Sequence, residues 1–217
     1  MNGAVNVASG GALNIAGNVF LDAALTNSGT VNWTNGNINM AYHSSTAGPI
    51  INQAGGIWNI SGNNYLSTAY APGYPSETNA YFINNGLLRT TGGTGTTQLG
   101  DNGNYVVSFR NYGTAESDSG IVSFEGGGLI GGNYTAGTDA TINFHNGTFS
   151  AGAVTLGGAG TFEFTGDTLT LSNTVPANLQ LLGGACDGIS SLWQPFRNSA
   201  SFSLAFFSLD VLAAPFP

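Results

Sequence analysis

Apolar and polar residues alternate along many short segments of this chain. Val31-Asn32-Trp33, Ile142-Asn143-Phe144 and Phe162-Glu163-Phe164 each flank one polar residue with two apolar residues. A period of two is the period of a β-strand, in which successive side chains point to opposite faces. Turn pairs such as Asn35-Gly36 and Asn146-Gly147 separate these segments, and no segment before residue 175 has convincing helical spacing. The pattern predicts an all-β protein built from many short strands.

A longer repeat is superimposed on this alternation. Its unit is an apolar residue, any residue, Asn, one or two further residues and Gly, followed by a strand. The equivalent asparagines are Asn27, Asn52, Asn84 and Asn111. Their spacing falls within the periods of about 20 to 50 residues that are typical of solenoids. We therefore predict a β-solenoid, with coils of two or three strands that turn their apolar side chains inward.

The repeat also predicts how the chain is divided. Residues 1–175 are expected to form the solenoid. Residues 62–80 contain prolines, which are excluded from central strands, and are expected to project as a loop. The repeat fades near the C-terminus, so residues 176–217 are expected to form either a cap over the last coil or a poorly ordered tail. The chain opens on repeat-like sequence without a signal peptide, so we expect it to start inside a longer protein.

Charged residues are scarce, and this narrows the possible partners. They make up 6% of the 217 residues, lysine is absent, and the net charge is −8. Nucleic acids and anionic membrane surfaces are recognised through Lys and Arg, so neither is an expected partner. No segment approaches the roughly 20 apolar residues of a membrane span. A single cysteine, Cys186, excludes an intrachain disulfide.

The four repeated asparagines are the clearest candidate site. On neighbouring coils their amides can form a ladder, because an amide donates and accepts hydrogen bonds at once. Such a ladder satisfies buried backbone groups at a tight corner. We favour this structural interpretation over a ligand-binding role.

Two groups of carboxylates could support glycoside cleavage, which needs two carboxyl groups about 5 to 9.5 Å apart. The first group is Glu116, Asp118 and Glu125, and the second is Glu163 and Asp167. A lyase would also need a basic proton acceptor, and arginine is the only strongly basic side chain in the chain. We favour the interpretation that these carboxylates are solvent-facing and expect no catalytic residue.

Metal and cofactor signals are weak. Asp101–Asn104 resembles part of a calcium loop without its later Glu. His43 and His145 lie far apart in sequence and suggest no third ligand. We expect neither a metal nor a cofactor.

Tyrosines cluster in and beside the expected loop. Tyr65, Tyr70, Tyr74 and Tyr81 could bind carbohydrate, because sugars stack on aromatic faces and loops on rigid scaffolds often carry recognition. The alternative is that the rings fold back and seal a coil.

The repeated unit, and most closely the segment Thr141–Asn173, resembles the Asn/Gly/Thr-rich repeats of large bacterial surface proteins. These include autotransporter passengers and filamentous-haemagglutinin-like adhesins. The resemblance covers roughly residues 3–173. It implies a right-handed parallel β-helix, an extracellular location and a role in attachment or display.

Three functions follow from these observations. The first is a non-catalytic structural or adhesive segment of a secreted or cell-surface protein, with surface glycans or host or matrix proteins as partners. The second is a polysaccharide-binding or polysaccharide-cleaving β-helix protein. The third, an ice-binding solenoid, needs a regular threonine array, and Thr90-Thr91 and Thr96-Thr97 are too irregular for one.

Overall fold

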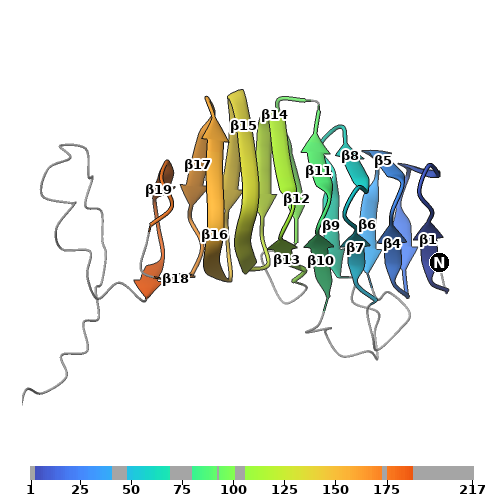
Figure 1. The fold of residues 1–217 in the computed structure, drawn as a ribbon, viewed down its shortest axis with the longest axis horizontal. Coiled ribbons are helices and arrows are strands. Elements are labelled where there is room, and N and C mark those ends of the chain that lie inside the picture. Colours follow the sequence, from blue (N-terminus) through green and yellow to red (C-terminus); the bar gives the residue numbers. More distant parts are fainter. Residues whose placement is uncertain are drawn as a thin grey trace, which may run out of the picture.

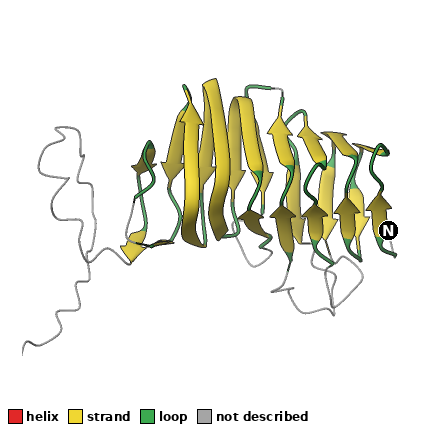
Figure 2. Cartoon of the chain, in the orientation of Figure 1, coloured by secondary structure: helices red, strands yellow, loops and turns green. Residues whose placement is uncertain are grey.

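A computed structural model describes residues 3–40, 48–68, 80–91, 93–100, 106–172 and 175–187. Twenty strands run through these residues, which contain no helix, and all twenty join in one sheet (Figures 1 and 2). Every strand pair is parallel, and each strand pairs with its counterpart one coil later in the chain. The prediction of an all-β protein is confirmed, and the pairing is that of a parallel β-solenoid.

The strands form three columns that run along the solenoid. The first column contains β1 (Val5–Val7), β4 (Leu25–Asn27), β7 (Ile50–Asn52), β10 (Tyr81–Asn84), β13 (Ser108–Asn111), the start of β15 (Gly128–Phe144), the start of β16 (Thr148–Gly158), β18 (Thr168–Leu171) and β20 (Ala185–Asp187). The second contains β2 (Ala12–Ala16), β5 (Thr30–Asn35), β8 (Ile57–Ile60), β11 (Leu87–Thr90), the start of β14 (Thr114–Phe124), the middle of β15 and the end of β16. The third contains β3 (Val19–Leu21), β6 (Asn37–Met40), β9 (Tyr65–Thr68), β12 (Thr96–Leu99), the ends of β14 and β15, β17 (Thr161–Phe164) and β19 (Leu179–Leu181).

The coils are longest in the middle of the chain and shorter toward both ends. The sequence separation between paired residues is larger for Phe82 and Phe109 than for Thr141 and Thr161. The long strands β14, β15 and β16 turn corners without leaving the sheet, and small register shifts mark those corners. The period predicted from the asparagine repeat therefore applies to the middle of the chain and not to its last third.

Two predicted boundaries are wrong. The expected loop at 62–80 includes β9, which pairs with β6 and β12, while residues 69–79 lie outside the described part of the chain. Leu66 and Thr68 point inward and are buried, and the prolines of this segment all follow β9. The solenoid also continues past residue 175, because β19 and β20 pair with β17 and β18 and Leu179 and Leu181 pack on the core. Residues 188–217 are outside the description.

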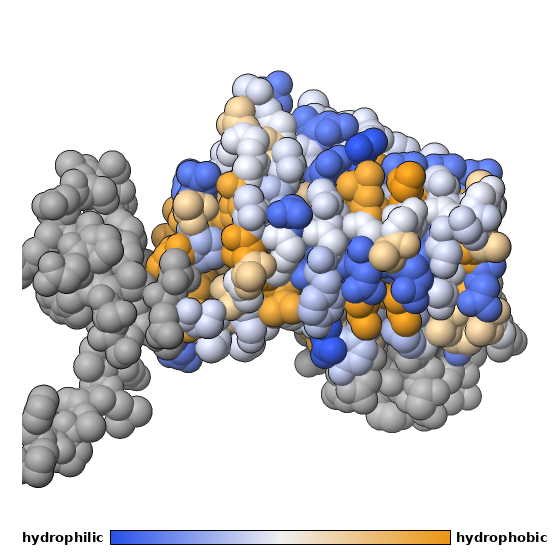
Figure 3. Space-filling model, in the orientation of Figure 1, coloured by the Kyte–Doolittle hydropathy of each residue, from blue (hydrophilic) through white to orange (hydrophobic). Residues whose placement is uncertain are grey.

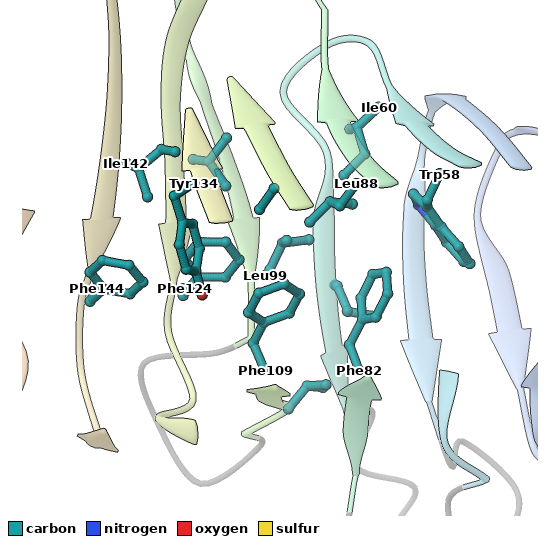
Figure 4. Close-up of a cluster of buried hydrophobic side chains, with 14 of the residues drawn as sticks. Trp58, Ile60, Phe82, Leu88, Leu99, Phe109, Phe124, Tyr134, Ile142 and Phe144 are labelled. Carbon is teal, nitrogen blue, oxygen red and sulfur yellow. The ribbon is translucent and has the colours of Figure 1, made fainter. Parts of the chain in front are cut away.

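Apolar side chains stack along the interior of the solenoid (Figure 4). In the third column, one inward-facing position is occupied on successive coils by Leu99, Phe124, Phe144 and Phe164, each at most 1% exposed. The Phe124 ring stacks on Phe144 at 5.6 Å and on Phe109 of the first column at 4.2 Å between ring centroids. Burying a side chain of this kind contributes roughly 1.5 to 3 kcal/mol, so each coil is stabilised mainly by the two coils beside it.

Candidate functional site

The four repeated asparagines lie one above another inside the solenoid. Each ends its first-column strand, and none is exposed to solvent. Nδ2 of Asn27 donates to Oδ1 of Asn52, Asn52 to Asn84, and Asn84 to Asn111, each across 2.8 Å. The amides thus form one continuous hydrogen-bonded chain through four coils.

Each amide also bonds to the backbone of the corner between the first and second columns. Nδ2 of Asn27, Asn52 and Asn84 donates to the carbonyl oxygens of Ile57, Leu87 and Thr114, at 3.0, 3.1 and 2.9 Å. Nδ2 of Asn111 donates to Gly131 at 2.8 Å. These bonds hold the corners of adjacent coils in register. Because the amides are buried, their role is structural and they offer no surface to a ligand.

A second amide ladder, which the sequence reasoning missed, lies on the outer side of the second column. Nδ2 of Asn32 donates to Oδ1 of Asn14, and Nδ2 of Asn59 donates to Oδ1 of Asn32, both at 2.9 Å. In the next two coils the equivalent outward positions are occupied by Arg89 and Glu116. The alternating triplets have a polar residue at their centre, and parallel pairing places the central residues of adjacent coils side by side. This pattern in the sequence could have revealed the second ladder.

The structure gives different surroundings to the carboxylates that could have supported glycoside cleavage. Glu116 is paired with Arg89, whose Nε lies 2.8 Å from Oε2. Asp118 is exposed beside the register shift of β14, and Glu125 is buried at the corner that follows β14. Glu163 lies in β17, and Asp167 accepts a 3.0 Å hydrogen bond from the backbone N–H of Gly147.

Metal and nucleophile chemistry find little support in the described part of the chain. Its His, Cys, Asp and Glu side chains form no group of three that could hold a metal ion. Burial, and then the neighbouring Asp187 carboxylate, raises the pKa of the Cys186 thiol, which opposes formation of a reactive thiolate. His43 and Asp101–Asn104 lie outside the described residues.

The candidate tyrosines do not form a common surface within the described residues. Tyr65 lies in β9 of the third column and is half-buried. Tyr81 lies in β10 of the first column, with the guanidinium carbon of Arg110 4.0 Å from the centroid of its ring. Tyr70 and Tyr74 fall outside the described residues.

A different tyrosine is the most exposed aromatic residue of the described chain. Tyr112 directly follows Asn111, points outward and is 57% exposed. In the three preceding coils the same corner position holds Ser28, Gln53 and Asn85, as the backbone hydrogen bonds from this position to the preceding coil show. We call the file of Gln53, Asn85 and Tyr112 the corner ridge. The corner ridge was not identified from the sequence. Its residues directly follow the ladder asparagines, and they stand out only once those asparagines are known to be buried.

The outer surface mixes apolar and polar residues in small groups, as Figure 3 shows for one face. No helix in the described ranges is long and apolar enough to cross a membrane. Comparison with known proteins gives no match to a family model, to a curated protein or to a solved structure.

Proposed function

We propose that this chain is a non-catalytic structural or adhesive segment of a secreted or cell-surface bacterial protein, and that its coils are right-handed. The observation that carries the proposal is the buried amide ladder, which joins four coils from Asn27 to Asn111. A polar chain of this kind holds these four coils in one register, which suits a rod that presents its outer surface to a partner. The resemblance to bacterial surface repeats supports the location and the handedness.

The outer faces of the solenoid are suited to display. Charged residues are scarce, and the outward positions carry mainly Asn, Thr and Ser, such as Asn14, Asn32 and Thr170. These side chains form hydrogen bonds with water or with a partner and lose less conformational entropy than Lys or Glu on becoming ordered. Stacked coils and buried rings stabilise the fold without a disulfide, which the single cysteine excludes within the chain.

We propose the corner ridge as the contact surface for a neutral glycan. The exposed face of Tyr112 can stack on the C–H face of a sugar ring. The amides of Asn85 and Gln53 follow at the spacing of the coils, about 4.8 Å, and can donate to and accept from sugar hydroxyls. The net charge of −8 opposes the binding of acidic polysaccharides.

Binding of defined sugars tests this function. The chain would be titrated with cellohexaose, laminarihexaose and mannohexaose as neutral probes, with polygalacturonate as the acidic comparison. We expect at least one neutral probe to bind, and Tyr112→Ala to weaken that binding by about tenfold, equivalent to about 1.4 kcal/mol. Ile121→Ala, which removes an exposed side chain from the third column, should leave binding unchanged.

Two results would contradict the proposal. Release of new reducing ends or unsaturated sugars from a probe would show catalysis. Failure of the chain to bind any of these glycans, together with failure to bind immobilised fibronectin, laminin or collagen, would remove the adhesive role.

A further inference from the structure

An arginine lies on the outer face of the first column, beside the corner ridge. Parallel pairing places Arg110 of β13 between Ile83 of β10 on the preceding coil and Leu129 of β15 on the following coil (Figure 1). All three residues alternate with buried neighbours, face outward and are half-buried. Tyr112, the exposed ring of the corner ridge, follows Arg110 by two residues. The arginine therefore stands on an apolar surface next to the proposed glycan contact.

The ring of Tyr81 holds the guanidinium group of Arg110 in place. The guanidinium carbon lies over this ring, 4.0 Å from its centroid. Tyr81 pairs with Ser108, two residues before Arg110, so the arginine side chain leans along the first column, away from Tyr112. A carboxylate can accept two parallel hydrogen bonds from the edge of a guanidinium group. Because Tyr81 orders the group before a ligand arrives, less conformational entropy is lost on binding.

The charge of Arg110 has no internal partner among the residues that the structure describes. Within those residues, no carboxylate oxygen lies within 4.0 Å of its guanidinium nitrogens. Arg89, by contrast, is paired with Glu116 at 2.8 Å. The side chains of Ile83 and Leu129, which flank Arg110, offer it no hydrogen bond. A permanently charged group with five donors is thus available to an anion from outside the chain.

We propose that Arg110 binds the carboxylate of an acidic sugar, in a glycan whose adjoining neutral sugar stacks on Tyr112. This inference rests on the proposed function and adds the chemical class of the glycan, a largely neutral chain with a single acidic unit. At most about 7 Å of extended chain separates the two residues, so one oligosaccharide can contact both. The exposed ring and the amides of the corner ridge favour a glycan over an acidic protein, because they suit the C–H faces and hydroxyl groups of sugars.

The net charge of −8 opposes a polyanion more than it opposes a single carboxylate. Repulsion between exposed charges is screened beyond about 8 Å at physiological ionic strength, so the guanidinium group dominates at contact distance. In a polyuronate every sugar is charged, and the units away from Arg110 find no matching cation at Arg89, which Glu116 already occupies. We therefore expect one acidic unit to strengthen binding and a fully acidic chain to bind weakly.

Hexasaccharides that differ at a single carbon test the inference. Cellohexaose, laminarihexaose and mannohexaose are each compared with the same chain oxidised to a carboxylate at C6 of its non-reducing terminal sugar. Wild type should bind at least one acidic form about five- to tenfold more tightly than its neutral parent, as expected for a charge-assisted hydrogen bond at a partly exposed site. The preference should shrink at about 0.5 M salt, because screening weakens the charge contact.

Substitutions assign the preference to one side chain. Arg110→Gln should reduce binding of the acidic probes to the level of the neutral probes. Arg110→Lys should keep only part of the preference, because an ammonium group lacks the paired donors. Arg89→Gln is the matched control, since it removes the same charge from a side chain already paired with Glu116, and it should keep the full preference. Tyr112→Ala should weaken both forms of a probe equally.

The outcomes separate this inference from the proposed function. Equal binding of the neutral and acidic forms would overturn the inference and leave the neutral glycan contact standing. An equal loss of preference in Arg110→Gln and Arg89→Gln would assign the effect to overall charge and would also overturn it. Displacement of the acidic probe by an equal concentration of N-acetylglutamate would show that sugar is not required, which contradicts a glycan site. Binding of acidic forms alone would support the site at Arg110 and remove the neutral contact.

Discussion

Replacing Asn84 by alanine tests the buried amide ladder at its centre. The Asn84 side chain accepts from Asn52 and donates to both Asn111 and the carbonyl oxygen of Thr114, at 2.8, 2.8 and 2.9 Å. The substitution removes these three bonds at a site with no solvent exposure. It also leaves Oδ1 of Asn111 without the donor that Asn84 supplies, in a place that water does not reach.

The expected loss of stability follows from these contacts. Each hydrogen bond contributes about 1 kcal/mol net, and an unsatisfied buried acceptor costs a further 1 to 3 kcal/mol, roughly. We expect Asn84→Ala to lower the free energy of unfolding by about 3 to 5 kcal/mol on this basis. Asn84→Asp has nearly the same volume and leaves no cavity, but it places a carboxylate at this buried site. It replaces the amide donor with an acceptor and should destabilise the fold at neutral pH by a similar amount.

Guanidinium chloride unfolding followed by circular dichroism measures the effect, with the slope of the transition checked for a change in cooperativity. The matched control is Asn85→Ala. Asn85 is the next residue and the same amino acid, but it points outward and is half-buried. Its replacement should change stability by about 0.5 kcal/mol or less. If the two alanine variants lose the same amount of stability, the reasoning about the ladder is refuted.

Three further predictions concern the core and the corners. Phe124→Ala should cost about 3 to 5 kcal/mol in denaturant unfolding, whereas Ile121→Ala in the same strand, at 39% exposure, should cost less than about 1 kcal/mol; equal losses would contradict the stacked core. Gly132→Ala should cost more than about 1 kcal/mol, because φ is +64° and a Cβ would overlap the backbone oxygen of Gly113 on the preceding coil; a neutral effect would exclude this corner geometry. Burial raises the pKa of the Tyr134 phenol, opposed in part by Asn111, so stability should fall above about pH 10, where the unfolded phenol ionises. Tyr134→Phe should make that alkaline loss smaller, and an identical pH profile would contradict the assignment.

The ladder positions could be read from the sequence because one residue type recurs in one phase. Amides that bond to one another at the same corner of successive coils leave a repeated signal of Asn, one or two residues and Gly. Asn27, Asn52, Asn84 and Asn111 share this signal. The strand at Tyr65–Thr68 leaves no comparable signal. It is short and lies close to two prolines, so its composition suggested a loop, and only its pairing with β6 and β12 reveals a strand.

Glu125, His145 and Thr165 lie on successive coils at the corner between the third and first columns, where the N–H of His145 donates to Phe124 and that of Thr165 to Phe144. This stack was hidden for a different reason. It lies where the coils are shorter than the asparagine repeat, so the period of that repeat places these three residues out of phase. The change of coil length arises at β14, β15 and β16, which turn corners without a loop. Corner geometry depends on glycines and register shifts more than on an apolar pattern, so it could not be predicted from the alternation of residues.

Pulsed electron–electron distances between spin labels on the first column test the coiled architecture most directly. In a Cys186→Ser background, one pair of labels would replace the exposed residues Asn6 and Thr170, and a second pair would replace Thr26 and Ser150. The first pair is separated by seven strand-to-strand steps and the second by five. At about 4.8 Å per step, we predict distances of about 34 Å and about 24 Å. Equal distances, or a shorter distance for the pair with more steps, would contradict the stacking of coils in a single parallel column.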